Sequence, residues 1–307
     1  MKEELYQKTG LIVSRLAQEL MGYTVQNRIP SISFFEEKFQ VSRGTIQNAF
    51  SFLKQANAIE LVNKGKLGTY LQAIDYRTLQ QYSIKDSLMG IMPLPYSKVY
   101  EGLASALYEE LKDSTLNFNM AYMHGAESRI SLVTKGAYDF AVCSLFAAQR
   151  AMESGQPIKI LCDFGEFSYL SKHVLVMHES YQNGIQDGMK VGYDSNSIDQ
   201  REITLELTKK LEHITLVPTH SHQIVSNIIK RIIDAGVWNY DEIQEHSEYA
   251  LQIVELKQMN LNQYTTAVIV IREQESALEH TLLQRLDKKR IRDVQAKVRS
   301  GELIPSY

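Results

Sequence analysis

Apolar residues between positions 43 and 55 recur at helical spacing and leave a strongly polar opposite face. Four of them stand at i, i+3, i+4 and i+7, which predicts one buried stripe on a helix: Ile46, Ala49, Phe50 and Leu53. Ser42 precedes this run and can cap the helix by accepting a hydrogen bond from an amide two or three residues later. The polar positions that would face outward are Arg43, Thr45, Gln47, Asn48, Ser51 and Lys54.

Two further helices are predicted ahead of this segment. Phe35 and Phe39 lie one turn apart. Ser33 followed by Glu36 has the spacing of a capping box, so the sequence predicts that the shorter helix begins near Ser33. Nearer the N-terminus, an apolar face at helical spacing is formed by Leu5, Ile12, Val13, Leu16 and Leu20.

Two β-strands are predicted after the polar helix, at residues 59–62 and 69–71, around a basic tip that contains two glycines. Three helices followed by a basic hairpin are typical of a winged helix-turn-helix. An amphipathic helix with a polar face is more commonly a solvated helix. The interpretation therefore depends on the neighbouring helices and hairpin rather than on the polar helix alone.

The residue types on the polar helix and the hairpin tip suit the recognition of double-stranded DNA. Arginine, glutamine and asparagine form paired hydrogen bonds with guanine or adenine edges, whereas serine, threonine and lysine reach phosphates. We therefore expect DNA to be a partner. The candidate DNA-binding residues are Ser31, Ser42, Arg43, Gly44, Thr45, Gln47, Asn48, Lys64, Gly65, Lys66, Gly68 and Thr69.

At these positions the chain resembles the GntR family of bacterial regulators. The resemblance covers residues 1–73 and rests on Pro30-Ser31, Val41-Ser42-Arg43, Ile46, Ala49, Leu53 and Gly68-Thr69-Tyr70. It implies a winged-helix dimer on a two-fold symmetric operator, with the helix from Arg43 as the reading helix and residues 64–69 as the wing. Two departures stand out: Ile32 and Ser33 replace an acidic and then a basic residue, and the wing is one residue longer between its glycines.

The remainder of the chain alternates between apolar runs and amphipathic helices. Strands are predicted at residues 88–92, 118–123, 139–143, 158–162, 173–177, 190–193, 214–217, 236–238 and 266–271. This alternation predicts mostly parallel sheets, and a last helix is predicted over residues 275–298. We expect a DNA-binding domain at residues 1–74, a polar linker at 75–85 and a ligand-sensing domain at 86–307.

Two lobes joined by a crossing near residue 173 and a return strand near residue 266 resemble the type 2 periplasmic-binding-protein fold. The predicted fold class is an N-terminal winged helix-turn-helix followed by a bilobed α/β domain of this kind. A GntR-like head on such a body is similar to the YhfZ family of regulators.

In sheets of this type, ligands lie beyond the carboxyl ends of the strands, where helix N-termini can hold anions. A carboxylate or phosphate effector would suit this position. The candidate ligand-binding residues are Pro93, Leu94, Pro95, Tyr96, His124, Gly125, Ser128, Ser144, Glu166, Asp194, Ser195, Asn196, Ser197, Thr219, His220 and Trp238. Polar residues before a helix are more commonly caps, and a single tryptophan more commonly belongs to a core.

Composition and charge narrow the class of protein. The hydrophobic content of 44% and charged content of 22% are those of a globular protein. Residues 1–77 hold ten Lys and Arg against seven Asp and Glu, a balance of +3. The whole chain carries −3, which leaves −6 on residues 78–307. A basic head on an acidic body fits a DNA-binding module joined to a sensor.

Other chemistries find little support in the sequence. Cys143 and Cys162 lie in apolar runs, which favours buried thiols over a disulfide or a nucleophile. No spacing of cysteine or histidine indicates a metal site, and no cofactor is expected. No apolar run has membrane-spanning length and no signal peptide opens the chain, so we expect a cytoplasmic protein without a membrane partner.

These features favour a homodimeric transcription regulator that is controlled by a small effector, and two alternatives stay open. One is a bilobed small-molecule-binding enzyme or biosynthetic protein with an N-terminal oligomerisation module, which would have no need of Lys64 and Lys66 in the wing. No nucleophile–base pair, paired carboxylates or phosphate loop is evident, so we assign no catalytic residue and do not expect an enzyme. The other is a regulator that uses its body only for assembly, for which an empty or collapsed cleft is expected.

Overall fold

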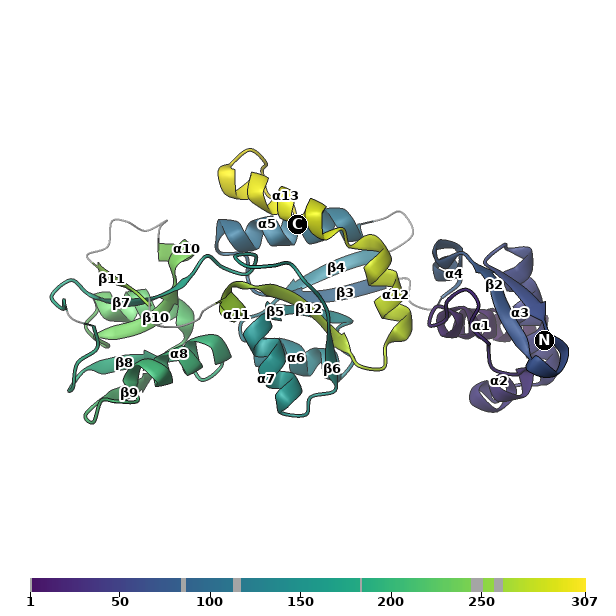
Figure 1. The fold of residues 1–307 in the computed structure, drawn as a ribbon, viewed down its shortest axis with the longest axis horizontal. Helices are drawn as coiled ribbons and strands as arrows, with labels where there is room; N and C mark the ends of the chain where they lie inside the picture. The colour runs from purple at the N-terminus through teal and green to yellow at the C-terminus, as the bar shows by residue number, and fades with distance from the viewer. Residues whose placement is uncertain (1, 84–86, 113–116, 183, 244–250, 257–261) are drawn as a thin grey trace. The chain divides into compact units, whose positions relative to one another are not determined.

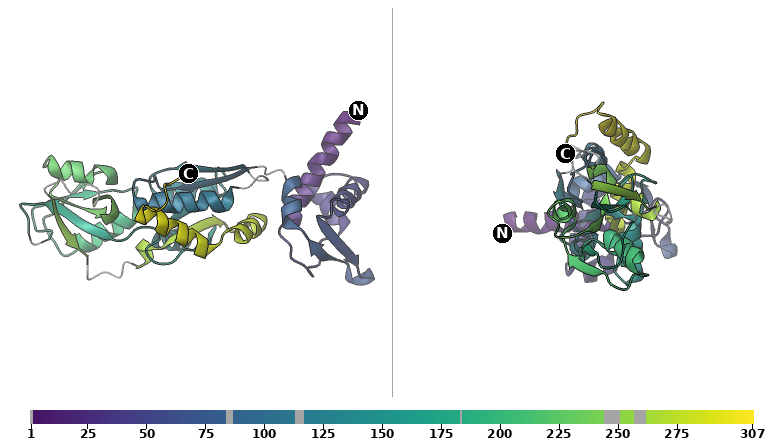
Figure 2. Two further views of the ribbon diagram at one scale, coloured as in Figure 1. Left: turned by 90° about the horizontal axis from the view of Figure 1, so that it is seen from above. Right: turned by 90° about the vertical axis from the view of Figure 1, so that its left-hand side faces the viewer.

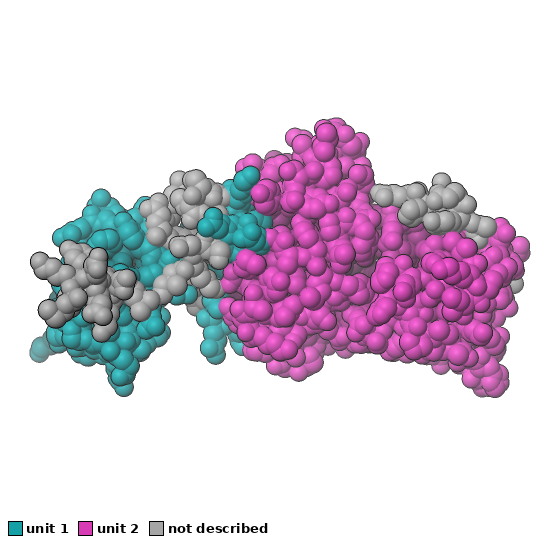
Figure 3. Space-filling view, turned by 180° about the vertical axis from the view of Figure 1, so that it is seen from behind, with its two compact units in different colours: residues 1–88, 111–119, 273–286 teal, residues 89–110, 120–272, 287–307 magenta. Residues whose placement is uncertain are grey.

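The chain forms two compact units, which are coloured separately in Figure 3. The computed structural model describes residues 2–83, 87–112, 117–182, 184–243, 251–256 and 262–307. The first unit comprises residues 1–88, 111–119 and 273–286, and the second unit contains the rest. We call residues 2–83 the head and the two-lobed remainder the body.

The head is a winged helix-turn-helix, as the sequence predicts (Figure 1). Its elements are α1 (Lys2–Leu20), α2 (Ile32–Phe39), α3 (Arg43–Gln55), β1 (Ile59–Asn63), the 3-10 turn η1 (Gly65–Leu67), β2 (Thr69–Ile74) and α4 (Tyr76–Tyr82). Strands β1 and β2 pair antiparallel, with Asn63 opposite Thr69 at the tip end of the wing.

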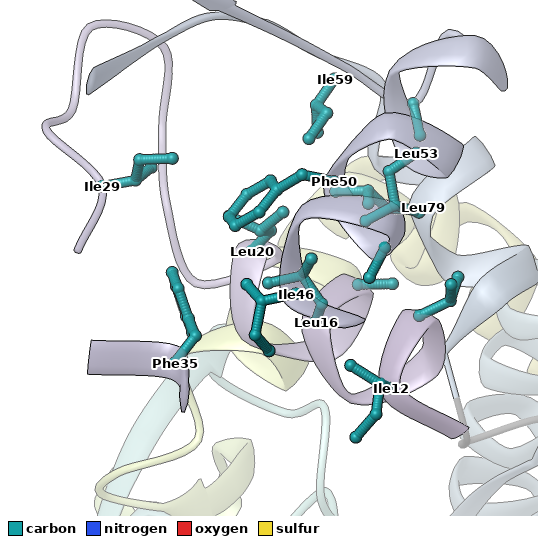
Figure 4. Packing of buried hydrophobic residues seen from close by; sticks show 14 of the residues in the cluster. Ile12, Leu16, Leu20, Ile29, Phe35, Ile46, Phe50, Leu53, Ile59 and Leu79 are labelled. Atoms are coloured by element: carbon teal, nitrogen blue, oxygen red, sulfur yellow. The ribbon is translucent and has the colours of Figure 1, made fainter. Parts of the chain in front are cut away.

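The predicted apolar stripe of α3 lies at the centre of the head core (Figure 4). Ile46, Ala49 and Leu53 are completely buried. The ring of Phe35 packs edge-on against that of Phe50, with centroids 5.6 Å apart. Helix α1 contributes Ile12, Val13, Leu16 and Leu20 to the same cluster. The side chain of Leu5, which the sequence places on this face, lies outside the described residues.

Each of the helices α2 and α3 begins at a serine cap. Ser42 Oγ accepts a hydrogen bond from the backbone N–H of Thr45 at 3.4 Å, which confirms the predicted cap of α3. The predicted cap of α2 at Ser33 is wrong, because Ser31 holds this role and accepts from the N–H of Phe34 at 3.2 Å. Ser31 has the extended backbone that a capping residue requires, whereas Ser33 is already inside the helix.

The segment predicted as a polar linker is helical over most of its length. Helix α4 buries Leu79 completely in the head core, and Tyr82 packs edge-on against Phe52 with ring centroids 5.1 Å apart. The hydroxyl of Tyr76 donates to the carbonyl of Tyr23 at 2.7 Å. Helix α4 therefore packs on the head through Leu79 and Tyr82, although most of its residues are polar. Residues 84–86 of the expected linker lie outside the described part of the chain.

Lobe 1 of the body is a five-stranded sheet in the order β4-β3-β5-β12-β6. Its elements are β3 (Ser87–Met92), α5 (Lys98–Leu111), β4 (Asn117–Tyr122), α6 (Ala126–Thr134), β5 (Phe140–Ser144), α7 (Leu145–Glu153), β6 (Ile158–Asp163), α11 (Asn262–Thr265) and β12 (Ala267–Arg272). Helices α6 and α7 cover one face of the sheet, and α5 lies on the other (Figure 1).

Lobe 2 is a second five-stranded sheet in the order β11-β7-β10-β8-β9. Its elements are β7 (His173–His178), β8 (Lys190–Tyr193), α8 (Ile198–Thr208), β9 (Thr215–Pro218), the 3-10 turn η2 (Ser221–Gln223), α9 (Ile224–Ile229), β10 (Ala235–Asn239), α10 (Tyr240–Ile243) and β11 (Leu251–Glu255). Strand β11 has no counterpart in the sequence prediction.

The prediction of mostly parallel sheets is wrong, because both sheets are mixed. Strand β12 runs antiparallel to β5 and β6, and β7 runs antiparallel to β10 and β11. Only the strands linked through helices, such as β3 with β5 and β8 with β9, are parallel. Strand β7 follows the first crossing between the lobes, and β12 follows the second.

The predicted C-terminal helix is two helices, α12 (Ser276–Arg285) and α13 (Lys288–Ser300). The break falls at Asp287, whose carboxylate caps α13 by accepting from the backbone N–H groups of Lys289 and Arg290. Helix α13 runs alongside α5 (Figures 1 and 2), and the side-chain amide of Gln295 donates to the carbonyl of Val99 at 2.9 Å. The basic helix thus packs on the body through a buried face.

We predict that Leu79→Ala destabilises the head by about 2–5 kcal/mol, because it leaves a cavity in the head core. Hydrogen exchange of head amides would detect the loss. The fluorescence of the single tryptophan, Trp238, reports on lobe 2 and should not change. Gln72→Ala, at an exposed position of β2, is the control. Unchanged head exchange in Leu79→Ala would show that α4 is not part of the head.

Candidate DNA-binding face and interlobe cleft

The outward face of α3 carries the polar side chains that the sequence predicts there. Arg43, Gln47 and Asn48 are exposed, and among the described residues none of them has a hydrogen-bond or ion-pair partner. Gly44 is exposed between them. The hydroxyls of Ser42 and Thr45 lie 3.0 Å apart and serve the helix cap. Three long polar side chains of α3 are therefore available to an external partner.

The wing tip is a short 3-10 turn with two exposed lysines, Lys64 and Lys66. The ammonium of Lys64 lies over the ring of Tyr70, 4.5 Å from its centroid. The backbone N–H of Gly65 donates to Asn63 Oδ1 at 2.8 Å. The tip therefore holds its shape through local contacts and presents its positive charge outward.

A groove of about 640 Å³ lies between α3, the start of α2 and the wing. Its described lining includes three cations, Arg28, Arg43 and Lys54, and no acidic residue. The uncharged polar residues of the lining are Ser31, Ser33, Gln47, Ser51, Asn63 and Thr69. The rest of the lining is Gly68 and apolar residues. Sequence reasoning missed Arg28, which lies in the loop before Pro30-Ser31. The only sequence signal for it is a basic residue beside the motif.

The cleft between the two lobes is small, with a cavity of about 40 Å³. Six residues predicted from strand ends line it: Pro93, Leu94, Tyr96, His124, Gly125 and Ser197. The strand-end rule therefore leads to this cavity, although it selects only part of the lining.

The other ten predicted residues do not line this cavity. Glu166 accepts a hydrogen bond from Asn262 at 2.6 Å. Trp238 is buried in the lobe 2 core with its ring stacked on Tyr96, as expected for a core tryptophan. Ser144 and Asp194 instead bind residues that line the cavity. The Ser144 hydroxyl donates to Asp199, and the Asp194 carboxylate pairs with His124. The remaining six are Pro95, Ser128, Ser195, Asn196, Thr219 and His220.

The charged residues of the cleft, Arg129 and Asp199, are both buried and were missed by sequence reasoning. Arg129 donates to the carbonyls of Val142 and Met123 and to the hydroxyl of Tyr169. Burial raises the pKa of Asp199 to about 7, although the Ser144 hydroxyl and the Arg129 guanidinium oppose this rise. Both residues stand inside the first two turns of their helices, beyond the strand-end positions that the sequence argument considered.

Two buried polar groups of the cleft lack a hydrogen-bond partner within the described residues. These are Asn239 Nδ2 and His173 Nδ1, whose residues are 2% and 3% exposed. Burial lowers the pKa of His173 to about 4, so its ring is neutral at physiological pH. An unpaired buried donor costs about 1–3 kcal/mol. Both groups line the cleft and are therefore suited to a polar ligand there.

Direct contacts hold the lobes together on either side of this cavity. His124 Nε2 of lobe 1 lies 3.0 Å from Asp194 Oδ2 of lobe 2. The guanidinium of Arg201 binds both carboxylate oxygens of Glu127, at 3.1 and 3.2 Å. A side chain at Gly125 would come within 2.8 Å of the carbonyl of Asn196, so this approach requires glycine. The structure therefore shows the lobes closed.

Hydrogen bonds also set the charge of Asp194. Burial alone would raise the pKa of Asp194, but hydrogen bonds from His124, Ser221 and the backbone of Asn196 outweigh it and hold the pKa well below its usual range. The carboxylate stays charged at all ordinary pH values. It is thus a permanent anion at the cleft edge, and His124 is its partner across the lobes.

The family of the chain follows from comparison with known proteins. The family model described as the YhfZ C-terminal domain matches residues 75–307. The chain belongs to the YhfZ family. A second family model, described as a helix-turn-helix domain, matches residues 25–71.

Relatives that bear the family name match over most of their length. YhfZ of Escherichia coli K12 is 28% identical over 308 residues, which cover 100% of each chain. The crystal structure of YhfZ from Shigella flexneri is 29% identical with a TM-score of 0.63, over 75% of this chain and 97% of that one.

The body also shares the fold of periplasmic binding proteins. The aliphatic sulphonate binding protein SsuA from Escherichia coli is 12% identical with a TM-score of 0.54, over 70% of this chain and 75% of that one. An ancestral arginine-binding protein is 13% identical with a TM-score of 0.53, over 71% of this chain and 98% of that one. At this identity the likeness concerns the fold alone, and it agrees with the predicted fold class.

The side chains at the cleft edge do not form a serine–histidine–aspartate relay. His124 and Ser221 both bind the carboxylate of Asp194, and within the described residues the Ser221 hydroxyl bonds to Asp194 and Gln200 rather than to a histidine ring. Burial raises the pKa of the Cys143 thiol to about 12 and that of Cys162 to about 11, which keeps both thiols protonated.

Metal and membrane sites were searched in the part of the chain that the structure describes. Three or more histidine, cysteine or acidic side chains do not come together there in a way that could hold a metal ion. None of the helices in that part is long and apolar enough to cross a membrane.

We predict that Asp199→Asn makes the body more stable than the wild type above about pH 7. The folded state holds the proton of Asp199 up to about pH 7 and the unfolded state only up to about pH 4. The wild type therefore loses stability as the pH rises through this window, by on the order of 4 kcal/mol, and the variant escapes this loss.

Urea unfolding followed by Trp238 fluorescence at several pH values checks this prediction. Glu206→Gln, at an exposed position of α8, is the control and should keep the wild-type pH profile. If the free energies of unfolding of the variant and the wild type changed in parallel with pH, the raised pKa of Asp199 would be contradicted.

Proposed function

We propose that the protein is a transcription regulator that binds double-stranded DNA through its head. The observation that carries this proposal is the exposed face of α3, where Arg43, Gln47 and Asn48 have no partner in the described chain. Arg43 and Gln47 also line a groove whose described lining holds three cations and no acid. Unpaired arginine and amide side chains on a helix are suited to base edges, and the neighbouring cations are suited to phosphates.

The mode of binding that we propose is that of a homodimer in the cytoplasm. Two heads place their α3 helices in successive major grooves of a two-fold symmetric operator. The wings, with Lys64 and Lys66, contact phosphates beside each half-site. The resemblance of the head to the GntR family supports this arrangement.

We further propose that a small anionic effector, a carboxylate or a phosphate, binds in the interlobe cleft. Among the described residues, Asn239 Nδ2 is a buried donor without a partner, and Arg129 uses three of its five N–H groups. An acceptor group on a ligand would satisfy both. The cavity of about 40 Å³ has room for about three waters. Entry of a ligand therefore requires the lobes to separate, and only a small one fits once they have closed.

Effector binding would act on DNA affinity through the balance between open and closed lobes. If the two forms of the body hold the heads of a dimer at different spacings, a ligand that favours one form shifts operator affinity. The shift equals the difference in the ligand's binding free energy for the two forms.

A second candidate function is favoured by the small size of the cleft. A body whose lobes are closed on about 40 Å³ could serve assembly of the regulator without sensing a molecule. The enzyme alternative has weaker support, because the serine and histidine at the cleft edge bind the same carboxylate and both cysteine thiols are buried.

We predict that Arg43→Ala abolishes sequence-specific DNA binding while leaving the fold intact, because Arg43 is exposed and has no partner within the described chain. Selection from pooled random duplexes, followed by sequencing, measures specificity. The wild type should enrich a two-fold symmetric motif and the variant should enrich none. Lys66→Ala, on the wing, should keep the motif and lower the salt slope by about one. Enrichment of the same motif by Arg43→Ala would contradict its role.

We predict that Asn239→Asp removes binding of small anions, because it replaces a buried donor with a carboxylate that repels them. Thermal unfolding in the presence of inorganic phosphate, acetate and larger carboxylates measures binding. A ligand at a hundred times its Kd should stabilise the wild type by about 2.7 kcal/mol.

Gln182→Glu adds the same charge at an exposed position of lobe 2 and is the control. Stabilisation of the wild type and of the control, but not of Asn239→Asp, is expected. Equal stabilisation of all three would place the anion elsewhere, and no stabilisation of any would favour the assembly function.

A further inference from the structure

The loop before α2 is fixed along the wing by backbone hydrogen bonds. The N–H of Ile29 donates to the carbonyl of Thr69 at 3.0 Å, and the N–H of Leu71 donates to the carbonyl of Asn27 at 3.0 Å. Arg28 stands between them and forms an isolated bridge with Tyr70. Ile29 is buried on the core side of this loop (Figure 4). The backbone of Arg28 is therefore held against β2, and its side chain is exposed.

Gly68, between the tip turn of the wing and β2, leaves the space that the Arg28 side chain occupies. A Cβ atom on Gly68 would lie 2.7 Å from Arg28 Nε and 3.3 Å from Cζ. Gly68 also has a φ of +95°, which side-chain-bearing residues rarely adopt. The side chain of Arg28 thus lies beside a position that favours glycine.

The guanidinium of Arg28 has no acceptor within the described residues. It lines the same groove as Arg43 and Lys54, and the described lining of that groove includes no acid. Ser31, the N-cap of the eight-residue helix α2, also lines this groove. Three cations beside a helix N-terminus are stabilised when an anion lies among them.

We propose that Arg28, positioned by Gly68, contacts a backbone phosphate of the bound DNA. This inference rests on the proposed DNA-binding function and adds a residue to it. Arg28 lies on a loop beside the wing and the start of α2, away from the α3 positions that would reach base edges. Gly68 then acts by giving room to Arg28, rather than by touching DNA as the sequence suggests.

The test measures binding of the full-length protein to two duplexes, one that carries the selected motif and one with the motif scrambled, over a salt series. Arg28→Ala should weaken binding to both duplexes by the same factor, roughly tenfold for one charge-assisted hydrogen bond. It should also lower the slope of log K against log salt by about one. Arg28→Lys, which keeps the charge, should restore the slope.

Arg15→Ala is the matched control, because it removes the same charge from an exposed position of α1 outside the groove lining. It should leave the slope unchanged. Arg28→Ala with the wild-type slope would overturn the proposal, and so would a loss confined to the motif duplex, which would indicate base reading. Failure of the wild type to bind either duplex would instead overturn DNA binding itself.

The role of Gly68 is tested by a double-mutant cycle, because Gly68→Ala also strains the wing backbone. If Gly68 acts through Arg28, Gly68→Ala weakens DNA binding much less in the Arg28→Ala background than in the wild type. Equal losses in both backgrounds would show that Gly68 acts on its own. Hydrogen exchange of the wing amides identifies any unfolding of the wing in these variants.

Discussion

The return of the chain as β12 is the constraint on which the body depends. This strand lies between β5 and β6, and Ala267 to Ile271 are completely buried. Strands β5 and β6 precede lobe 2 in the chain, so the sheet of lobe 1 is complete only when the chain has passed through lobe 2 and come back. Lobe 2 is therefore held at two crossings, one before β7 and one after β11.

Closing this cleft buries polar groups, and only some of them have hydrogen-bond partners among the described residues. Arg129 has carbonyl and hydroxyl partners, and Asp199 is relieved by holding its proton up to about pH 7. Asn239 Nδ2 and His173 Nδ1 remain unpaired among the described residues. The free energy of closing thus contains an unfavourable part that a small ligand with acceptor groups would remove. Ion pairs at the edge of the cleft, such as Arg201 with Glu127, stabilise the closed form without a ligand.

In the head, unlike in the cleft, the core is apolar and the described charged side chains lie at the surface. The apolar side of α3 packs into the core through Ile46, Ala49 and Leu53. The polar side chains on the opposite side of the helix are not needed for this packing. The groove beside α3 holds three cations, and its described lining includes no acid. An anion that enters the groove, such as the phosphate backbone of the DNA that we propose as a partner, would offset this positive charge.

The sequence by itself determined the elements that depend on neighbours along the chain. The stripe of α3, its cap at Ser42, the wing strands and most body strands follow from spacing and capping within about ten residues. Tertiary structure decided whatever depends on a distant partner. The direction of β12, the docking of α4 through Leu79, the fit of Arg28 over Gly68 and the burial of Arg129 and Asp199 in one cleft were not readable in advance. Each joins residues remote in sequence, and local periodicity carries no information about which remote segment a side chain will meet.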